Sequence, residues 1–171
     1  MASLGQEAKQ GQARGPNPDR YEQGLAIGAV PLLVAVLVAV GRGRAQWLLV
    51  PAVVWLHLIP VTVALALTPV ILLRRRGDRL HRRLGWVWAA AMAMAALASF
   101  AVRTITPGRF SLIHLLSVYV LIQLPALICA ARRHDIARHR KIVRGMVTGA
   151  LLIAGFFTFP FHRLLGQWLL G

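Results

Sequence analysis

The side chains of this chain that could carry chemistry are its six histidines, which are His57, His81, His114, His134, His139 and His162. His57 and His114 fall inside long apolar stretches. An ionisable group within a membrane span is costly to bury, so it marks a functional site by default. Imidazole is a common metal ligand, and two imidazoles can ligate a haem iron from opposite sides. The histidines are therefore candidate haem ligands.

The spacing of four histidines predicts two layers. His57 and His114 lie 17 and 18 residues before the arginines that end their apolar stretches. At 1.5 Å per residue these separations are about 26 and 27 Å, so the two rings are expected at nearly equal depth. His81 and His139 both begin the next apolar stretch in a basic context, which predicts a second layer. Alternate helices of a four-helix bundle face each other diagonally, so each layer has the geometry to hold one haem b.

Each of these residues also has a rival interpretation. His57 and His114 can instead form interhelical hydrogen bonds that hold a bundle together. His81 and His139 lie among arginines at headgroup depth, where a phosphate-binding or solvated face is ordinary. Arg144, about one turn inside the last stretch, is a candidate for pairing with a haem propionate or for reaching back to the interface.

The sequence lacks the residues that other catalytic or ion-binding mechanisms require. The five carboxylates all lie near or outside the ends of the apolar stretches, and none lies in the middle of one; they are Glu7, Asp19, Glu22, Asp78 and Asp135. This distribution argues against a carboxylate proton relay, an oxygen cage for cations and a paired-carboxylate hydrolase. The sequence has no phosphate-binding glycine loop, zinc-protease helix or nucleophile elbow. The single cysteine, Cys129, excludes an internal disulfide.

Five stretches are long and apolar enough to cross a membrane, in a chain that is 57% hydrophobic and 15% charged. They span roughly 24–40, 47–73, 84–102, 110–131 and 142–162. We therefore expect an all-α, polytopic membrane protein, in which stretches two to five form a four-helix transmembrane bundle and the first is an additional N-terminal transmembrane helix. The expected units are a flexible cytoplasmic tail (1–22), the N-terminal helix with its outer loop (23–46) and the four-helix domain (47–171).

The basic residues predict the orientation. The tail and the connections at 74–83 and 132–144 hold 15 of the 20 Lys and Arg residues, and the opposite side holds 5. Because basic loops remain in the cytoplasm, the N-terminus is expected in the cytoplasm and the C-terminus in the periplasm. The net charge of +15 is then a topology signal. Membrane lipids with anionic headgroups are the expected partners, and nucleic acid is not.

Small residues line two of the stretches. Stretch three is rich in alanine, and stretch five has Gly145 and Gly149 four residues apart. Such faces leave room for a cofactor, but membrane helices also use them to pack closely without any ligand.

Four segments resemble the bacterial membrane family known as domain of unknown function 2306. They are GDRLHRRLGW (77–86), FSLIHLLS (110–117), ARRHDIARHR (131–140) and GFFTF (155–159). The likeness covers about residues 50–171 and implies a bacterial inner membrane protein. The arrangement of histidines is also similar to that of the cytochrome b561 superfamily, in which four helices bind two haems. That similarity implies that His57 pairs with His114 and that His81 pairs with His139.

The leading hypothesis is a di-haem b-type cytochrome that carries electrons across the bilayer, an oxidoreductase in function, with a quinone or a redox protein as partner. It would work alone or within a larger respiratory or photosynthetic complex. The alternative is a cofactor-free or lipid-binding accessory subunit that stabilises such a complex by helix packing.

Overall fold

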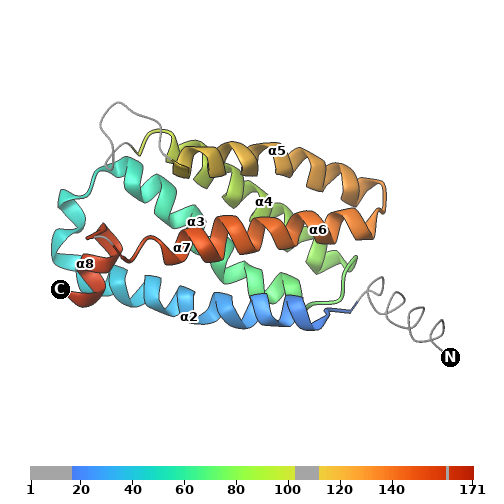
Figure 1. Cartoon of the computed structure of the whole chain (residues 1–171), viewed down its shortest axis with the longest axis horizontal. Coiled ribbons are helices and arrows are strands. Elements are labelled where there is room, and N and C mark those ends of the chain that lie inside the picture. The colour runs from blue at the N-terminus through green and yellow to red at the C-terminus, as the bar shows by residue number, and fades with distance from the viewer. Residues whose placement is uncertain (1–16, 103–111, 161) are drawn as a thin grey trace.

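The computed structural model describes residues 17–102, 112–160 and 162–171, and 84% of them are helical (Figure 1). No strand occurs in these three ranges. The long helices are α2 (Arg20–Arg42), α3 (Ala52–Leu73), α4 (Arg79–Ser99) and α5 (Leu112–Arg132). The next one begins as α6 (Ile136–Met146) and continues through a π-helical segment, η2 (Val147–Ile153), into α7 (Ala154–Phe156). A 3₁₀ segment, η1 (Gly43–Leu49), follows α2, and α8 (Leu164–Leu170) ends the chain.

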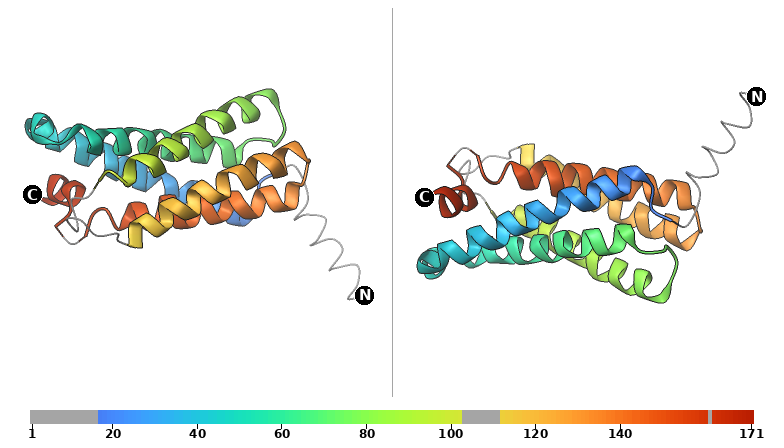
Figure 2. Two further views of the ribbon diagram at one scale, coloured as in Figure 1. Left: turned by 90° about the horizontal axis from the view of Figure 1, so that it is seen from above. Right: turned by 90° about the horizontal axis from the view of Figure 1, so that it is seen from below.

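The long helices lie alongside one another and alternate in direction (Figures 1 and 2). In chain order each of α3 to α6 packs against the helix before it, and α2 packs against both α3 and η2. As a result α2, α4 and α6 all begin at one end of the bundle. We call this the basic end, formed by the start of α2 and the α3–α4 and α5–α6 turns.

The opposite end holds a cluster of indole rings, and we call it the tryptophan end. The ring centroids of Trp47 and Trp55 are 5.6 Å apart, and those of Trp55 and Trp168 are 6.3 Å apart. Trp168 Nε1 donates a hydrogen bond to Gln46 Oε1 at 2.8 Å. This cluster joins α8 to η1 and the start of α3.

Among the residues that the structure describes, three helical segments are long and apolar enough to cross a membrane: Arg20–Leu49, Ala52–Leu73 and His114–Arg132. Ile27, Leu56 and Ile122 are among many large apolar side chains exposed on the outside of the bundle, which suits contact with lipid tails. The prediction of an all-α protein with membrane-spanning helices is therefore confirmed at this level. The count of five spans, with α2 as an additional one, stays a prediction.

Helices α4 and α6 begin earlier than their hydropathy predicts, because aspartates cap them. The Asp78 carboxylate accepts the backbone N–H of His81, and the Asp135 carboxylate accepts that of Arg138. Each bond satisfies an amide that has no acceptor within the helix. The basic residues of 79–83 and 136–141 are consequently helical, so a search for apolar stretches places both starts several residues late.

The interior is packed mainly with alanine and larger aliphatic side chains, together with the aromatic ring of Trp88. The alanine face of α4 lies in the core, with Ala91 and Ala96 among its buried residues. Between α3 and α4, the buried Trp88 donates from Nε1 to Thr68 Oγ1 at 3.1 Å. Gly145 allows α6 to approach α5 closely, because a Cβ atom there would lie 2.7 Å from the Tyr119 hydroxyl oxygen. The small residues of α4 and α6 therefore serve close helix packing in this structure.

Candidate metal centre at the basic end

Within the described ranges three helices begin at the basic end, and an aspartate caps each of them: Asp19 for α2, Asp78 for α4 and Asp135 for α6. Helix α2 has a full capping box, in which Asp19 Oδ1 accepts from the Glu22 N–H at 3.0 Å and Glu22 Oε2 accepts from the Asp19 N–H at 3.2 Å. The caps concentrate acidic residues at an end that is otherwise rich in arginine.

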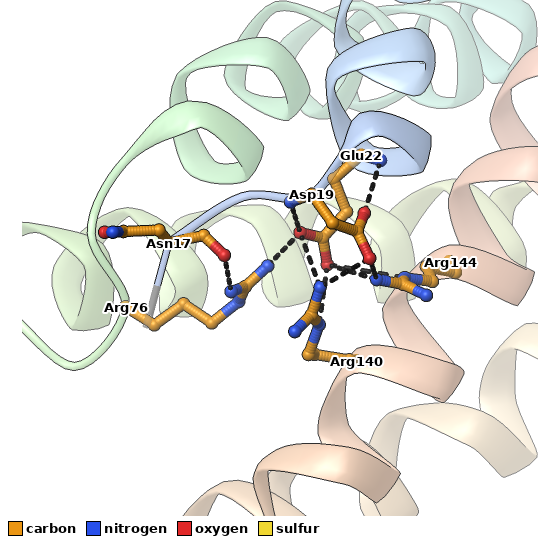
Figure 3. Close-up of polar contacts among 6 residues, drawn as sticks. All are labelled: Asn17, Asp19, Glu22, Arg76, Arg140 and Arg144. Atoms are coloured by element: carbon orange, nitrogen blue, oxygen red, sulfur yellow. Dashed lines mark hydrogen bonds and ion pairs between the residues drawn. The ribbon is translucent and has the colours of Figure 1, made fainter. Parts of the chain in front are cut away.

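Glu22 and Asp19 are bound by arginines from two other parts of the chain (Figure 3). Glu22 is 2% exposed and Arg140 is 4% exposed, although both are charged residues. Arg140 Nε lies 3.1 Å from Glu22 Oε1, and its Nη2 lies 2.7 Å from Asp19 Oδ2. Burial of such charges is tolerated only where opposite charges and hydrogen bonds surround them.

Two further guanidinium groups complete this network. Arg76, from the α3–α4 turn, donates to Glu22 Oε2 and, at 2.9 Å, to the carbonyl oxygen of Asn17. Arg144, one turn after Arg140, contacts Asp19 and lies 3.3 Å from Glu22 Oε1. We call these five charged residues, Asp19, Glu22, Arg76, Arg140 and Arg144, the acid–arginine cluster.

Arg144 was a candidate for pairing with a haem propionate. In the structure its guanidinium contacts the first turn of α2, where it also lies 5.4 Å from the centre of the Tyr21 ring. Its pairing with a haem propionate stays a prediction.

The cluster controls the ionisation of Asp19. Burial alone would raise the pKa of this carboxyl group. The hydrogen bond from the Glu22 amide and the positive charges of Arg144 and Arg140 outweigh burial, so the pKa of Asp19 lies below its usual value. Asp19 therefore remains a carboxylate that can cap α2 and bind arginine together.

The structure brings His81 and His139 together beside this cluster. Their ring centroids are 6.4 Å apart, with the ring planes inclined by 57°. His81 lies three residues after the cap Asp78, and His139 lies four residues after the cap Asp135, so each ring projects from the first turn of its helix. Both Nδ1 atoms are buried, and neither has a hydrogen-bond partner within the described ranges. Buried polar atoms without partners are uncommon in folded proteins.

The surroundings of the pair favour neutral rings. Burial and the nearby charge of Arg76 lower the pKa of His81, and the carboxylate of Asp78 opposes them only in part. Burial and repulsion from His81 lower the pKa of His139, while a hydrogen bond with the Leu127 backbone and the charge of Glu22 act in the opposite direction. The neutral form of imidazole is the one that binds metals, because it retains a lone pair on one nitrogen.

The separation of the two rings fits one metal ion between them. The ring centroids are 6.4 Å apart, which is close enough for both imidazoles to contact one ligand. No group of three or more His, Cys, Asp or Glu residues in the described part of the chain could hold a metal ion. Two imidazoles are, however, the full protein contribution to a haem iron with two axial histidines.

The other two predicted haem ligands, His57 and His114, lie toward the tryptophan end, His57 against α4 and His114 beside Phe100, which follows α4. His57 Nδ1 lies 2.8 Å from the carbonyl oxygen of Ala95. Because a carbonyl only accepts, Nδ1 carries the proton and the lone pair is on Nε2, which is the usual arrangement of a metal-ligating histidine. His114 is buried, and its ring centroid lies 5.8 Å from that of Phe100. His134 and His162 both have positive φ, and His134 lies in the α5–α6 turn.

Sequence analysis missed the acid–arginine cluster. The arginines were interpreted as a topology signal with anionic lipid headgroups as their partners, but Arg140 is buried and pairs with Glu22, 118 residues away in the chain. The spacing of Asp19 and Glu22 was the available signal, because it is that of a capping box and predicts a fixed helix start. No sequence pattern indicated which arginines would reach it.

Comparison with known proteins adds no relative: no family model, no curated protein and no solved structure matches this chain. The resemblances drawn from the sequence motifs stay predictions.

Proposed function

We propose that this protein is a b-type membrane cytochrome whose haem at the basic end is held by His81 and His139. The observation that carries the proposal is the pairing of these two rings, 6.4 Å apart, from helices that do not follow each other in the chain. Their Nδ1 atoms are buried and have no hydrogen-bond partner in the described structure, which suits rings that bind a cofactor.

The roles of this chain's own residues follow from their positions. His81 and His139 would hold the haem iron, and their aspartate-capped helix starts hold the rings in place. Low histidine pKa values keep the imidazoles neutral and ready to bind. When bound, haem iron supplies one-electron redox chemistry that no side chain here provides.

A second haem is proposed at His57 and His114. The hydrogen bond between His57 and the Ala95 carbonyl supports this assignment, since it orients the ring and leaves Nε2 available. His81 and Ala95 are 14 residues apart on α4, or about 21 Å along the helix axis. The two sites would therefore lie in opposite halves of the bundle and form an electron path across the membrane.

The proposal also assigns a location and partners to the protein. It would lie in the bacterial inner membrane with its basic end in the cytoplasm, because basic connections are retained there. A quinone or a redox protein would exchange electrons with the two sites, and membrane lipids would surround the apolar outer surface. The resemblances to the family of domain of unknown function 2306 and to the cytochrome b561 superfamily support the same assignment.

The test is a reduced-minus-oxidised absorption spectrum of the purified protein, combined with haem quantification. The proposal expects two haems per chain, falling to about one in His81→Ala and in His139→Ala. His134→Asn is the matched control, because His134 is an exposed histidine in the α5–α6 turn, and it should retain both haems. A folded but colourless protein would overturn the proposal and leave the cofactor-free accessory subunit as the better explanation.

A further inference from the structure

The first turn of α2 lies between the two segments that carry the basic-end histidines (Figure 3). Glu22 contacts Arg76 on one side and Arg140 on the other. Arg76 precedes His81 by five residues in the α3–α4 turn and the start of α4, and Arg140 directly follows His139 on α6. A single buried carboxylate thus connects the two elements whose spacing determines whether the rings can share a ligand.

We propose that Glu22 is a positioning residue, which holds the start of α4 and the start of α6 at the separation that the His81–His139 pair needs to bind its metal centre. It acts through Arg76 and Arg140. The inference rests on the proposed function for its metal centre, but the spacing it describes is a property of the protein alone.

The charges explain why this carboxylate determines the spacing. Arg76, Arg140 and Arg144 retain their positive charges at any physiological pH. Glu22 and Asp19 together offset two of these three charges, and a low local dielectric makes each attraction and repulsion stronger than it is in water. Without Glu22, three guanidinium groups would face one carboxylate, and their mutual repulsion would move the α3–α4 turn away from α6.

Asp19 cannot take over the contact that Glu22 makes with the α3–α4 turn. It is 28% exposed, it is already committed to capping α2, and its contacts are with Arg140 and Arg144 on α6. Glu22 is the residue of this pair that also contacts the α3–α4 turn, through Arg76. The two carboxylates therefore have different roles: Asp19 fixes α2 to α6, and Glu22 fixes both to the α3–α4 turn that leads into α4.

The first experiment measures the spacing without any cofactor. Spin labels on Arg79→Cys and Arg138→Cys, two exposed positions at the starts of α4 and α6, report the distance by pulsed electron paramagnetic resonance, in a Cys129→Ser background. Glu22→Gln should lengthen and broaden the distance distribution, whereas Glu22→Asp, which keeps the charge, should restore most of it. An unchanged distribution in Glu22→Gln would overturn the inference.

The second experiment measures the consequence for the metal centre in the haem-loaded protein. Substitutions in the residues that support metal ligands typically weaken binding by about 10–100-fold. Glu22→Gln should therefore lose haem at the basic end about 10–100-fold more readily and alter its low-spin signal, while haem at His57 and His114 is unaffected. Equal losses at both sites would indicate general destabilisation and would overturn the specific role.

A compensating variant keeps the test decisive if Glu22→Gln does not fold. Glu22→Gln combined with Arg76→Gln removes one charge of each sign, so the repulsion among the guanidinium groups is no greater than before. This double variant should fold, and its distance distribution should be broader than that of the wild type, because no carboxylate then binds the α3–α4 turn; a native distribution would overturn the inference. If the wild type binds no haem, the proposed function fails, but the label distances still decide whether Glu22 sets the spacing.

Discussion

Replacing Arg140 with alanine should destabilise the protein far more than replacing a neighbouring exposed arginine. Arg140 is 4% exposed and contacts both carboxylates of the acid–arginine cluster. Removing one member of a buried ion pair costs about 3–5 kcal/mol, because the partner is left buried and unpaired. Arg76 and Arg144 still contact Glu22 in this variant, so the lower value, about 3 kcal/mol, applies.

The assay is thermal unfolding in detergent, followed by far-ultraviolet circular dichroism. For a chain of this size, 1 kcal/mol changes the Tm by about 2–4 °C, so Arg140→Ala should lower it by about 6–12 °C. Arg138→Ala, on the same helix but exposed, should change stability by less than about 0.5 kcal/mol. Equal Tm values for the two variants would refute the claim that the cluster holds α2 to α6.

Two other predictions concern pH and packing. In the cofactor-free protein, the lowered pKa values of His81 and His139 mean that the unfolded chain binds more protons below the usual histidine value of 6.5. The free energy of unfolding should therefore decrease as the pH falls below about 6.5. Urea unfolding should show a smaller decrease in a variant with both His81 and His139 replaced by glutamine. An equal decrease in the two proteins would contradict this prediction. Gly43→Ala would place Cβ 2.1 Å from Cδ2 of Trp168 and should cost about 1–3 kcal/mol. Gly41→Ala meets no atom within 4 Å and should leave the Tm unchanged or raise it, so similar unfolding of both variants would argue against this packing.

The helices were predictable because their apolar stretches are long and nearly free of charge. The starts of α4 and α6 were not, because hydropathy excludes arginine-rich turns that Asp78 and Asp135 nevertheless make helical. Capping depends on one hydrogen bond at a helix start, and its effect is invisible to an average over 20 residues.

The candidate site was predictable in part. Equal placement of His81 and His139 at the starts of alternate helices predicts that they can meet, and the structure brings their rings together. The partners of Arg144 were not predictable, because the ion pairs of the cluster join residues more than 50 positions apart in the chain. Which arginine remains on the surface and which is buried depends on the packing of α2, and the local sequence around each one is similarly basic.

Low-temperature electron paramagnetic resonance of the oxidised, purified protein tests the central claim most directly. The proposal predicts a low-spin ferric signal typical of two axial imidazoles, with the basic-end component lost in His139→Ala. A folded wild-type protein without this signal, or a signal that His81→Ala and His139→Ala both leave intact, would contradict a haem held between α4 and α6.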